Sequence, residues 1–283
     1  MIVGIDSYCF HRLYGEIYPN QIDPGVRWEF EQCIDEAIRL EVDGISLETC
    51  FMPSFDATYL AKLKDRLDEH ELKRMLAWGH PDGLEGGNNP EGAKEIEKHL
   101  ETTKALGGDT MRIVGSSLMF RDQPHGAQIE RISKILGETV KRAEDAGVKL
   151  AIENHIDFTS DEILQILHQV DSEYLGVNFD SGNTLRVFED PVEAARKLAK
   201  YTLATHIKDI DPSTGSPQDW TFWASAPAGA GIIDMPGVVD ALREGGYDGM
   251  LCVEIDFLKN QDADEVEGVE MAVVYLKKLL AAS

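Results

Sequence analysis

The sequence predicts an α/β protein, a single (β/α)8 TIM barrel that spans residues 1–283. Short β-type runs alternate with amphipathic helical stretches along the whole chain of 283 residues. This alternation, with short buried strands, is typical of a closed parallel barrel. The rival architecture, an open doubly wound sheet, usually has a glycine-rich turn after its first strand. Here that turn reads DSYCFHRLYGE, so the barrel is favoured.

Eight apolar runs of strand length predict the barrel strands. The first is IVGID, and the fifth, KLAIE, ends abruptly in a polar Glu-Asn-His sequence. The eight runs cover residues 2–6, 44–48, 74–78, 110–115, 149–153, 175–180, 203–208 and 250–255.

Eight stretches with apolar residues at helical spacing lie between these runs. Thr159 and Ser160 precede acidic residues, which is an N-cap signature, and Gly147 suits a C-cap. Asp190 stands before a proline that fits the first helical turn. The helical stretches cover residues 28–40, 57–70, 90–106, 126–147, 159–170, 190–201, 235–246 and 264–282.

The long segment from Asp209 to Ile233 is the one extended loop, and in a barrel it follows strand 7 on the catalytic face. Loops of this length in compact domains are often functional. Its aromatic residues, Trp220, Phe222 and Trp223, could stack on a sugar ring, close a lid, or equally form an oligomer contact.

Composition and charge narrow the class of protein. Hydrophobic residues make up 43% of the chain, which is enough for a sizeable core, and the net charge is −24. Such an acidic chain repels nucleic acid and anionic lipid, so we expect neither as a partner. None of the four cysteines forms a C-x-x-C pair, the N-terminus lacks a basic signal region, and no run is long enough to span a membrane. We expect a soluble cytoplasmic protein, and homo-oligomer formation is left open.

Barrel active sites form at the carboxyl ends of the strands, so the polar residue at each strand end is a candidate. Four consecutive strands present Glu153, Asp180, His206 and Glu254 at equivalent depth. A single glutamate at a strand end is usually a solvated loop residue, and a single histidine is usually a hydrogen-bonded packing residue. The same pattern on four consecutive strands is much less expected by chance. Three carboxylates in one mouth raise each other's pKa unless a positive charge compensates. The set therefore predicts one divalent metal ion, with Mn²⁺ favoured and Mg²⁺, Co²⁺ or Zn²⁺ as alternatives.

Several segments resemble the xylose-isomerase-like TIM-barrel superfamily of sugar isomerases and epimerases. The resemblance is tightest from residue 149 to 256 and is carried by AIENH, LGVNFDSGN, THIKD and GAGIIDMPGVVDALREGGYDGMLCVEID. It implies that Glu153, Asp180, His206 and Glu254 bind one divalent metal. It also implies that Glu153 and Glu254 form the acid/base pair found in ketose 3-epimerases.

Two positions depart from known branches of that superfamily. The epimerases usually have Glu-Pro after strand 5, whereas this chain has Glu153 followed by Asn154 and His155. The endonuclease branch builds a three-metal site from additional histidines, and Asn183 stands where that branch has one of them. Together with the net charge, this disfavours an endonuclease.

These residues suggest an enediolate mechanism. A metal that chelates a substrate carbonyl and the neighbouring hydroxyl favours loss of the adjacent carbon-bound proton. Glu153, Glu254 or His155 could take that proton. His155 lies two residues after Glu153, so both side chains point the same way; it is either a base or substrate contact, or a residue that orients a ligand. Lys208 either stabilises the enolate oxygen or forms a rim salt bridge with Asp209.

The remaining candidates are substrate contacts. His80 could bind a hydroxyl or cap a loop, and Trp78 stands beside it. Glu48 and Arg112 are either barrel-bottom ion-pair partners or substrate contacts, and an arginine in the site would suit an acidic substrate. Asp6 and His11, at and after strand 1, are weaker candidates.

Four functions follow, and the first is preferred. It is a metal-dependent isomerase or epimerase of a keto-sugar or sugar acid. The alternative is a metal-dependent lyase or decarboxylase that acts on a 3-keto sugar acid or 3-keto glycoside through the same enolate chemistry. A metal-dependent endonuclease and a non-catalytic binding barrel are the remaining interpretations.

Overall fold

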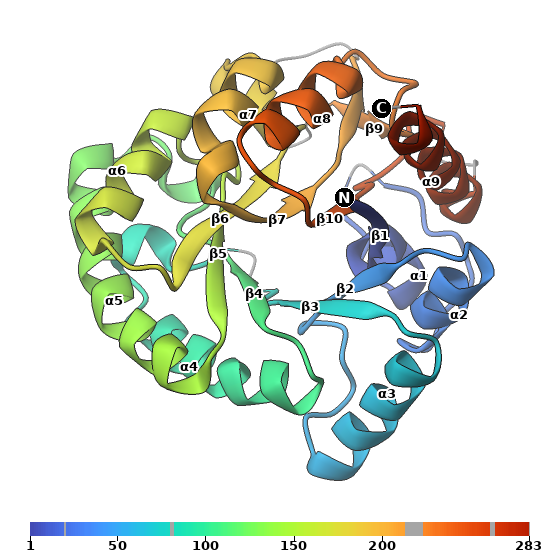
Figure 1. Cartoon of the computed structure of the whole chain (residues 1–283), viewed down its shortest axis with the longest axis horizontal. Helices are drawn as coiled ribbons and strands as arrows, with labels where there is room; N and C mark the ends of the chain where they lie inside the picture. The colour runs from blue at the N-terminus through green and yellow to red at the C-terminus, as the bar shows by residue number, and fades with distance from the viewer. Residues whose placement is uncertain (20, 80–81, 213–222, 261–263, 283) are drawn as a thin grey trace.

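Eight parallel strands surround a central axis, and the helices form a ring outside them in the computed structural model (Figure 1). The structure describes residues 1–19, 21–79, 82–212, 223–260 and 264–282. The predicted (β/α)8 TIM barrel is confirmed. The eight barrel strands are β1 (Ile2–Asp6), β2 (Gly44–Glu48), β3 (Lys73–Ala77), β4 (Thr110–Ile113), β5 (Lys149–Glu153), β6 (Leu175–Asp180), β7 (Thr202–His206) and β10 (Met250–Val253).

The strands are hydrogen-bonded in the order β10-β1-β2-β3-β4-β5-β6-β7. The gap between the two ends of this order is bridged just beyond β7, where Ile207 pairs in parallel with Val253 of β10. The N–H of Ile207 donates to the Cys252 carbonyl at 2.7 Å, and the N–H of Glu254 donates to the Ile207 carbonyl at 3.2 Å. These bonds bring the ends of β7 and β10 together, which matters because both ends carry candidate site residues.

The predicted helices are present, with shifts of a few residues at some ends. Thr159 and Glu162 form a capping box at the start of α6, Asp190 caps α7 before its proline, and Gly147 ends α5 at a φ of 67°. The helices are α1 (His11–Tyr14), α2 (Gln32–Arg39), α3 (Ala57–Glu69), α4 (Pro90–Ala105), α5 (His125–Ala146), α6 (Ser160–Val170), α7 (Pro191–Leu198), α8 (Met235–Glu244) and α9 (Glu265–Ala281).

Among the described residues, five short 3-10 segments join these elements. They lie at Ser7–Phe10, Glu85–Gly87, Leu118–Phe120, Asn183–Val187 and Ala199–Tyr201.

The hydrophobic core fills the space between the strands and the surrounding helices. Ile5, Ile45, Ile113 and Val177 from the strands are buried in one cluster with apolar residues of the helices, such as Leu136. A smaller apolar cluster of Met75, Ala151 and Ala204 lies among β3, β5 and β7. Alternating side chains thus give each strand two buried faces, as expected for a barrel surrounded by helices.

The segment after β7 contains structure that the sequence pattern did not predict. β8 (Asp209–Asp211) and β9 (Ala224–Ala226) pair as a short antiparallel hairpin. The Asp209 carboxylate accepts hydrogen bonds at 2.9–3.0 Å from the N–H groups of Gly229, Gly231 and Ile233. A Cβ at Gly231 would lie 2.2 Å from Asp209 Oδ1, so a glycine is required for this close approach. Trp223 packs against the core, whereas Trp220 and Phe222 lie outside the described residues.

In the described part of the chain, no helix combines the length and the apolar character that crossing a membrane requires.

Candidate active site

A cavity of about 280 Å³ opens at the carboxyl ends of the barrel strands. It is lined by charged side chains from β2, β4, β5 and the segments that follow β7 and β10, and by tyrosines that follow β1. The lining includes Tyr8, Tyr18, Glu48, Cys50, Gly79, Arg112, Glu153, His155, Asn183, Arg186, Lys208, Glu254 and Asp256. The cavity is therefore a small site at the carboxyl end of the barrel, with several charged side chains in its wall.

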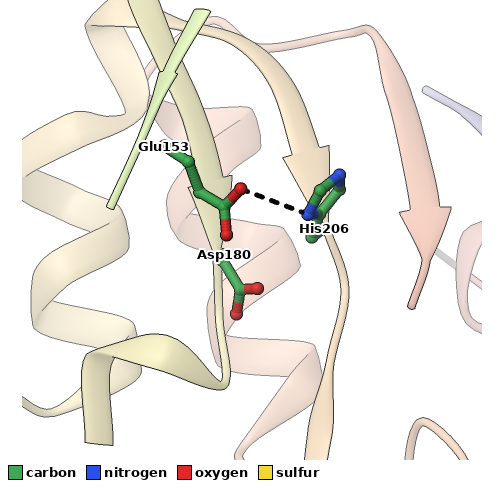
Figure 2. A group of neighbouring side chains, drawn as sticks. All are labelled: Glu153, Asp180 and His206. Atoms are coloured by element: carbon green, nitrogen blue, oxygen red, sulfur yellow. Dashed lines mark ion pairs between the residues drawn. The ribbon is translucent and has the colours of Figure 1, made fainter. Parts of the chain in front are cut away.

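Three of the four predicted metal ligands converge beside this cavity. Glu153, Asp180 and His206 are the last residues of β5, β6 and β7, and each is at most 1% exposed. One donor atom from each lies within 4.8 Å of the others. Figure 2 shows the Glu153 carboxylate directed toward the His206 ring, with the Asp180 carboxylate next to both. Strand-end position on neighbouring strands is what brings them together.

The fourth predicted ligand, Glu254, reaches the group through His206. Its Oε2 lies 3.1 Å from His206 Nδ1, and Glu153 Oε2 lies 3.7 Å from the same nitrogen. Glu254 follows β10 directly, and the backbone bonds between Ile207 and β10 hold it there. Both glutamates therefore approach the same nitrogen of the imidazole ring.

Asp6 occupies the opposite side of that ring. Its Oδ2 lies 3.3 Å from His206 Nε2, and both side chains are fully buried. A carboxylate on one ring nitrogen fixes which nitrogen is available as a ligand. Asp6 was only a weak candidate from the sequence, and its strand-end position on β1 was the available signal. His11, the other weak candidate, bonds to the backbone carbonyls of Glu16 and Asp256.

Two asparagines hold the carboxylates in position. The amide group of Asn154 exchanges two hydrogen bonds with the Asp180 backbone, at 2.8 and 2.9 Å. Asn183 donates from its backbone N–H to Asp180 Oδ1 at 2.8 Å and from Nδ2 to Glu153 Oε1 at 2.9 Å. The sequence drew attention to these positions only as departures from known branches, and their positioning role was missed.

Two buried cations neutralise part of the acidic cluster. Arg112 Nε donates to Glu153 Oε2, and its NH1 lies 3.4 Å from Glu48 Oε1. This pair lines the cavity, so the alternative of a barrel-bottom ion pair is wrong. Lys208 Nζ lies 3.3 Å from Asp180 Oδ2 and 3.0 Å from both Glu254 Oε2 and Asp256 Oδ1.

The rim salt bridge between Lys208 and Asp209 is also wrong as an alternative. Successive strand residues point to opposite sides, so Lys208 faces the cavity while Asp209 turns to the loop backbone.

The cluster shifts the pKa of most of its members. Burial raises the pKa of Asp180 to about 8, although Lys208 acts in the opposite direction. Burial also opposes ionisation of Glu254, but His206 and Lys208 outweigh it and hold its pKa well below the usual range. Despite burial, Glu254 and Glu153 raise the pKa of His206 well above its usual value. Opposed shifts among neighbouring groups are a feature of functional sites.

Residues 34–278 match the sequence profile of the xylose isomerase-like TIM barrel family. The chain belongs to this family. An inosose dehydratase of Lacticaseibacillus casei is 25% identical over 273 residues, which cover 88% of each chain. Among solved structures, the IOLI protein with a binding zinc atom is 18% identical, covers 100% of this chain and 99% of its own, and has a TM-score of 0.78. An L-ribulose 3-epimerase is 18% identical, covers 99% of this chain and 95% of its own, and has a TM-score of 0.77. The resemblance predicted from the sequence is confirmed.

The donor set of this family member fits a divalent cation. Asp180 Oδ2, Glu254 Oε2 and His206 Nδ1 are buried atoms that form ion pairs within the cluster but no hydrogen bond of good geometry in the described structure. Buried polar atoms normally have a partner, and carboxylate oxygen with one imidazole nitrogen is a usual set for Mn²⁺, Mg²⁺, Co²⁺ or catalytic Zn²⁺. The residues present therefore suit one ion of this class.

His155 lines the cavity together with Glu153, as the two-residue spacing predicted. Its Nδ1 is buried and has no hydrogen-bond partner among the described residues. Burial lowers the pKa of His155 to about 4, so the ring is neutral near pH 7.

Trp78 does not reach the cavity. It is 2% exposed and packs in the core, and its indole N–H donates to Glu95 of α4 at 3.2 Å. Residue 78 follows the last residue of β3, where the side chain turns outward to the helix layer, so its prediction as a substrate contact is corrected. His80 lies outside the described residues.

Proposed function

We propose that this chain is a divalent-metal-dependent enzyme that acts on a small carbohydrate ketone through an enediolate. The observation that carries the proposal is the convergence of Glu153, Asp180 and His206 within 4.8 Å of one another. They lie beside a cavity of about 280 Å³, at the barrel end where enzymes of this architecture react. A cavity of this size suits a small molecule.

Glu153, Asp180, His206 and Glu254 would hold the ion. When bound, it would supply the positive charge that polarises a ketone carbonyl and favours the enediolate. Mn²⁺ remains our first choice for an oxygen-rich set, and the zinc in the IOLI structure keeps Zn²⁺ beside Mg²⁺ and Co²⁺ as alternatives.

The chain's own residues would perform the proton transfers. Glu153, Glu254 or the neutral His155 would take the proton from the carbon next to the carbonyl. Lys208, with its ammonium group among three carboxylates, would stabilise negative charge on the substrate oxygen. Arg112 and Asn183 would orient Glu153 through the hydrogen bonds that they donate to its two oxygens.

We propose dehydration of a keto-polyol, a lyase reaction, as the overall outcome. The inosose dehydratase match, at 25% identity over 88% of both chains, favours loss of water after enediolate formation. Isomerisation or epimerisation, the outcome that the sequence motifs first suggested, is the second candidate. It is favoured by the approach of Glu153 and Glu254 to the same imidazole nitrogen, because two such carboxylates can exchange a proton with one substrate.

The test is incubation of the Mn²⁺-loaded protein in D₂O with a panel of keto-inositols and ketoses. Deuterium incorporation next to the carbonyl together with loss of water supports the proposed dehydratase. Incorporation with an isomer as the product supports the second candidate, and release of CO₂ or an aglycone supports the other lyase outcomes. Absence of exchange and product across the panel would contradict the proposed chemistry.

A further inference from the structure

A buried carboxyl group faces the cavity from the side opposite the proposed metal ligands. Glu48 is the last residue of β2, which lies four places from β6 in the eight-strand order. Glu48 and Asp180 therefore lie on opposite sides of the closed barrel. Glu48 is 2% exposed and lines the cavity.

One oxygen of Glu48 lies in the cavity wall without a hydrogen-bond partner among the described residues. This atom, Glu48 Oε2, is buried. A Cβ at Gly79 would lie 2.6 Å from this oxygen, so any larger residue at this position would collide with the carboxyl group. Gly79 also lines the cavity. A buried polar atom without a partner requires an explanation, and here the carboxyl group lines the cavity in which a substrate would lie.

The other oxygen of Glu48 faces a cation that connects it to the metal side. Glu48 Oε1 lies 3.4 Å from Arg112 NH1, while Arg112 Nε donates to Glu153. Burial raises the pKa of Glu48 to about 8, despite the lowering effect of Arg112. Glu48 therefore carries a proton near neutral pH, and Arg112 is placed to stabilise the carboxylate once that proton has left. Both features are expected of a general acid.

The proposed dehydration needs such a group. Glu153, Glu254 and His155 can account for removal of the carbon-bound proton, but hydroxide is a poor leaving group unless it is protonated. Lys208 is held by three carboxylates, and His155 is neutral. From the geometry of its free oxygen, we infer that Glu48 is the general acid that protonates the leaving hydroxyl.

The inference rests on the proposed function and completes its chemistry. The base takes the proton from the carbon next to the carbonyl, and the electron pair forms the enediolate. The enediolate electrons then form a new carbon–carbon double bond as the adjacent C–O bond breaks. The Glu48 proton passes to the departing oxygen, which leaves as water. Glu48 becomes a carboxylate beside Arg112 and regains a proton from solvent. The base releases to solvent the proton that it took from carbon.

The experiment compares wild type with Glu48→Gln, both loaded with Mn²⁺. Two probes are used: a keto-inositol, and its analogue with fluorine in place of the hydroxyl that leaves. Deuterium exchange next to the carbonyl and product formation are followed separately by NMR. Glu138→Gln is the matched control, since Glu138 is an exposed carboxylate of α5 that pairs with Lys141 and does not line the cavity. Mn²⁺ binding is measured for each protein.

We expect Glu48→Gln to slow water loss by roughly a hundredfold or more, the usual contribution of a general acid, while exchange and Mn²⁺ binding stay within about threefold of wild type. Fluoride loss, which needs no comparable protonation, should also stay close to the wild-type rate. Glu138→Gln should change none of these rates by more than about threefold.

Equal losses of exchange and water elimination, or fluoride loss that is slowed as much as water loss, would show that Glu48 only shapes the site. Unchanged water loss would also overturn the inference. A wild-type protein that neither exchanges nor dehydrates the probe would instead overturn the proposed function, and the inference with it.

Discussion

The two ends of this barrel are built from the same strands but are lined by different groups. At the carboxyl end, the cavity of about 280 Å³ is lined by carboxylates, three cations and a histidine. At the amino end, a smaller cavity of about 130 Å³ is lined by Met75, Ala204 and Met250 together with Lys73, Arg74 and Asp109. Met75 and Ala204 also belong to the apolar cluster inside the barrel.

The change occurs within single strands. On β5, Ala151 faces that apolar cluster, and Glu153, two residues later, faces the cavity. On β7, Ala204 belongs to that apolar cluster, and His206, two residues later, lies among the proposed metal ligands. Side chains two residues apart share one face of a strand. On each of these two strands, an apolar packing residue is therefore followed by a site residue within about 7 Å. One end therefore stabilises the fold, and the other holds buried charge that costs stability.

The largest expected effect is at the carboxyl end, in Glu254→Gln. The substitution removes a proposed ligand, a candidate base and the negative charge beside His206 and Lys208. We expect turnover to fall by roughly a thousandfold or more and Mn²⁺ binding to weaken. Steady-state kinetics and calorimetric metal titration measure both. A wild-type kcat in this variant would show that Glu254 has no role in catalysis.

His155→Asn separates the two interpretations of the histidine. Because His155 Nδ1 bonds to no candidate ligand in the described structure, we expect kcat to fall by roughly a hundredfold while Mn²⁺ affinity stays nearly constant. Loss of metal binding with a proportionate loss of activity would assign it instead to orienting a ligand.

Met75→Ala tests the opposite end. Met75 is 4% exposed in the apolar cluster, so its truncation should leave a void and lower the free energy of unfolding by about 2–5 kcal/mol. Chemical denaturation measures this loss, and kcat should stay at the wild-type value. A large fall in kcat at a temperature where the variant is folded would contradict the assignment of stability to one end and activity to the other.

The last prediction concerns Asp157 and the change in the free energy of unfolding with pH. Burial raises its pKa to about 7, so from about pH 4 to pH 7 the folded state binds this proton more tightly than the unfolded state. Stability should therefore fall as pH rises through this window, by about 1 kcal/mol per pH unit from this group. Denaturation of wild type and Asp157→Asn at several pH values measures the difference. Parallel pH profiles for the two proteins would show that Asp157 contributes none of it.

The sequence predicted most of the barrel because its signals are local. Period-2 runs, helical spacing and caps such as Thr159 are visible in short windows, and strand-end position was enough to select Glu153, Asp180 and His206. The contact of Asp6 with His206 depends on closure of the barrel, which cannot be seen in any short stretch of the sequence. Trp78 was wrongly expected to face the cavity. The strand ends at Ala77, and the side chain of the next residue, Trp78, packs in the core.

The short strands β8 and β9 were missed for a related reason. Three residues are too few to show a period, and the hairpin depends on backbone bonds to Asp209 that a linear reading does not reveal.

The central claim is that the buried carboxylates and His206 share one dication that the chemistry requires. The most direct measurement is turnover of a keto-inositol by chelator-treated protein during titration with Mn²⁺. We predict that activity is lost on chelation and returns in proportion to the Mn²⁺ bound, until one ion is bound per chain. Full activity in protein shown to be free of metal would contradict the account.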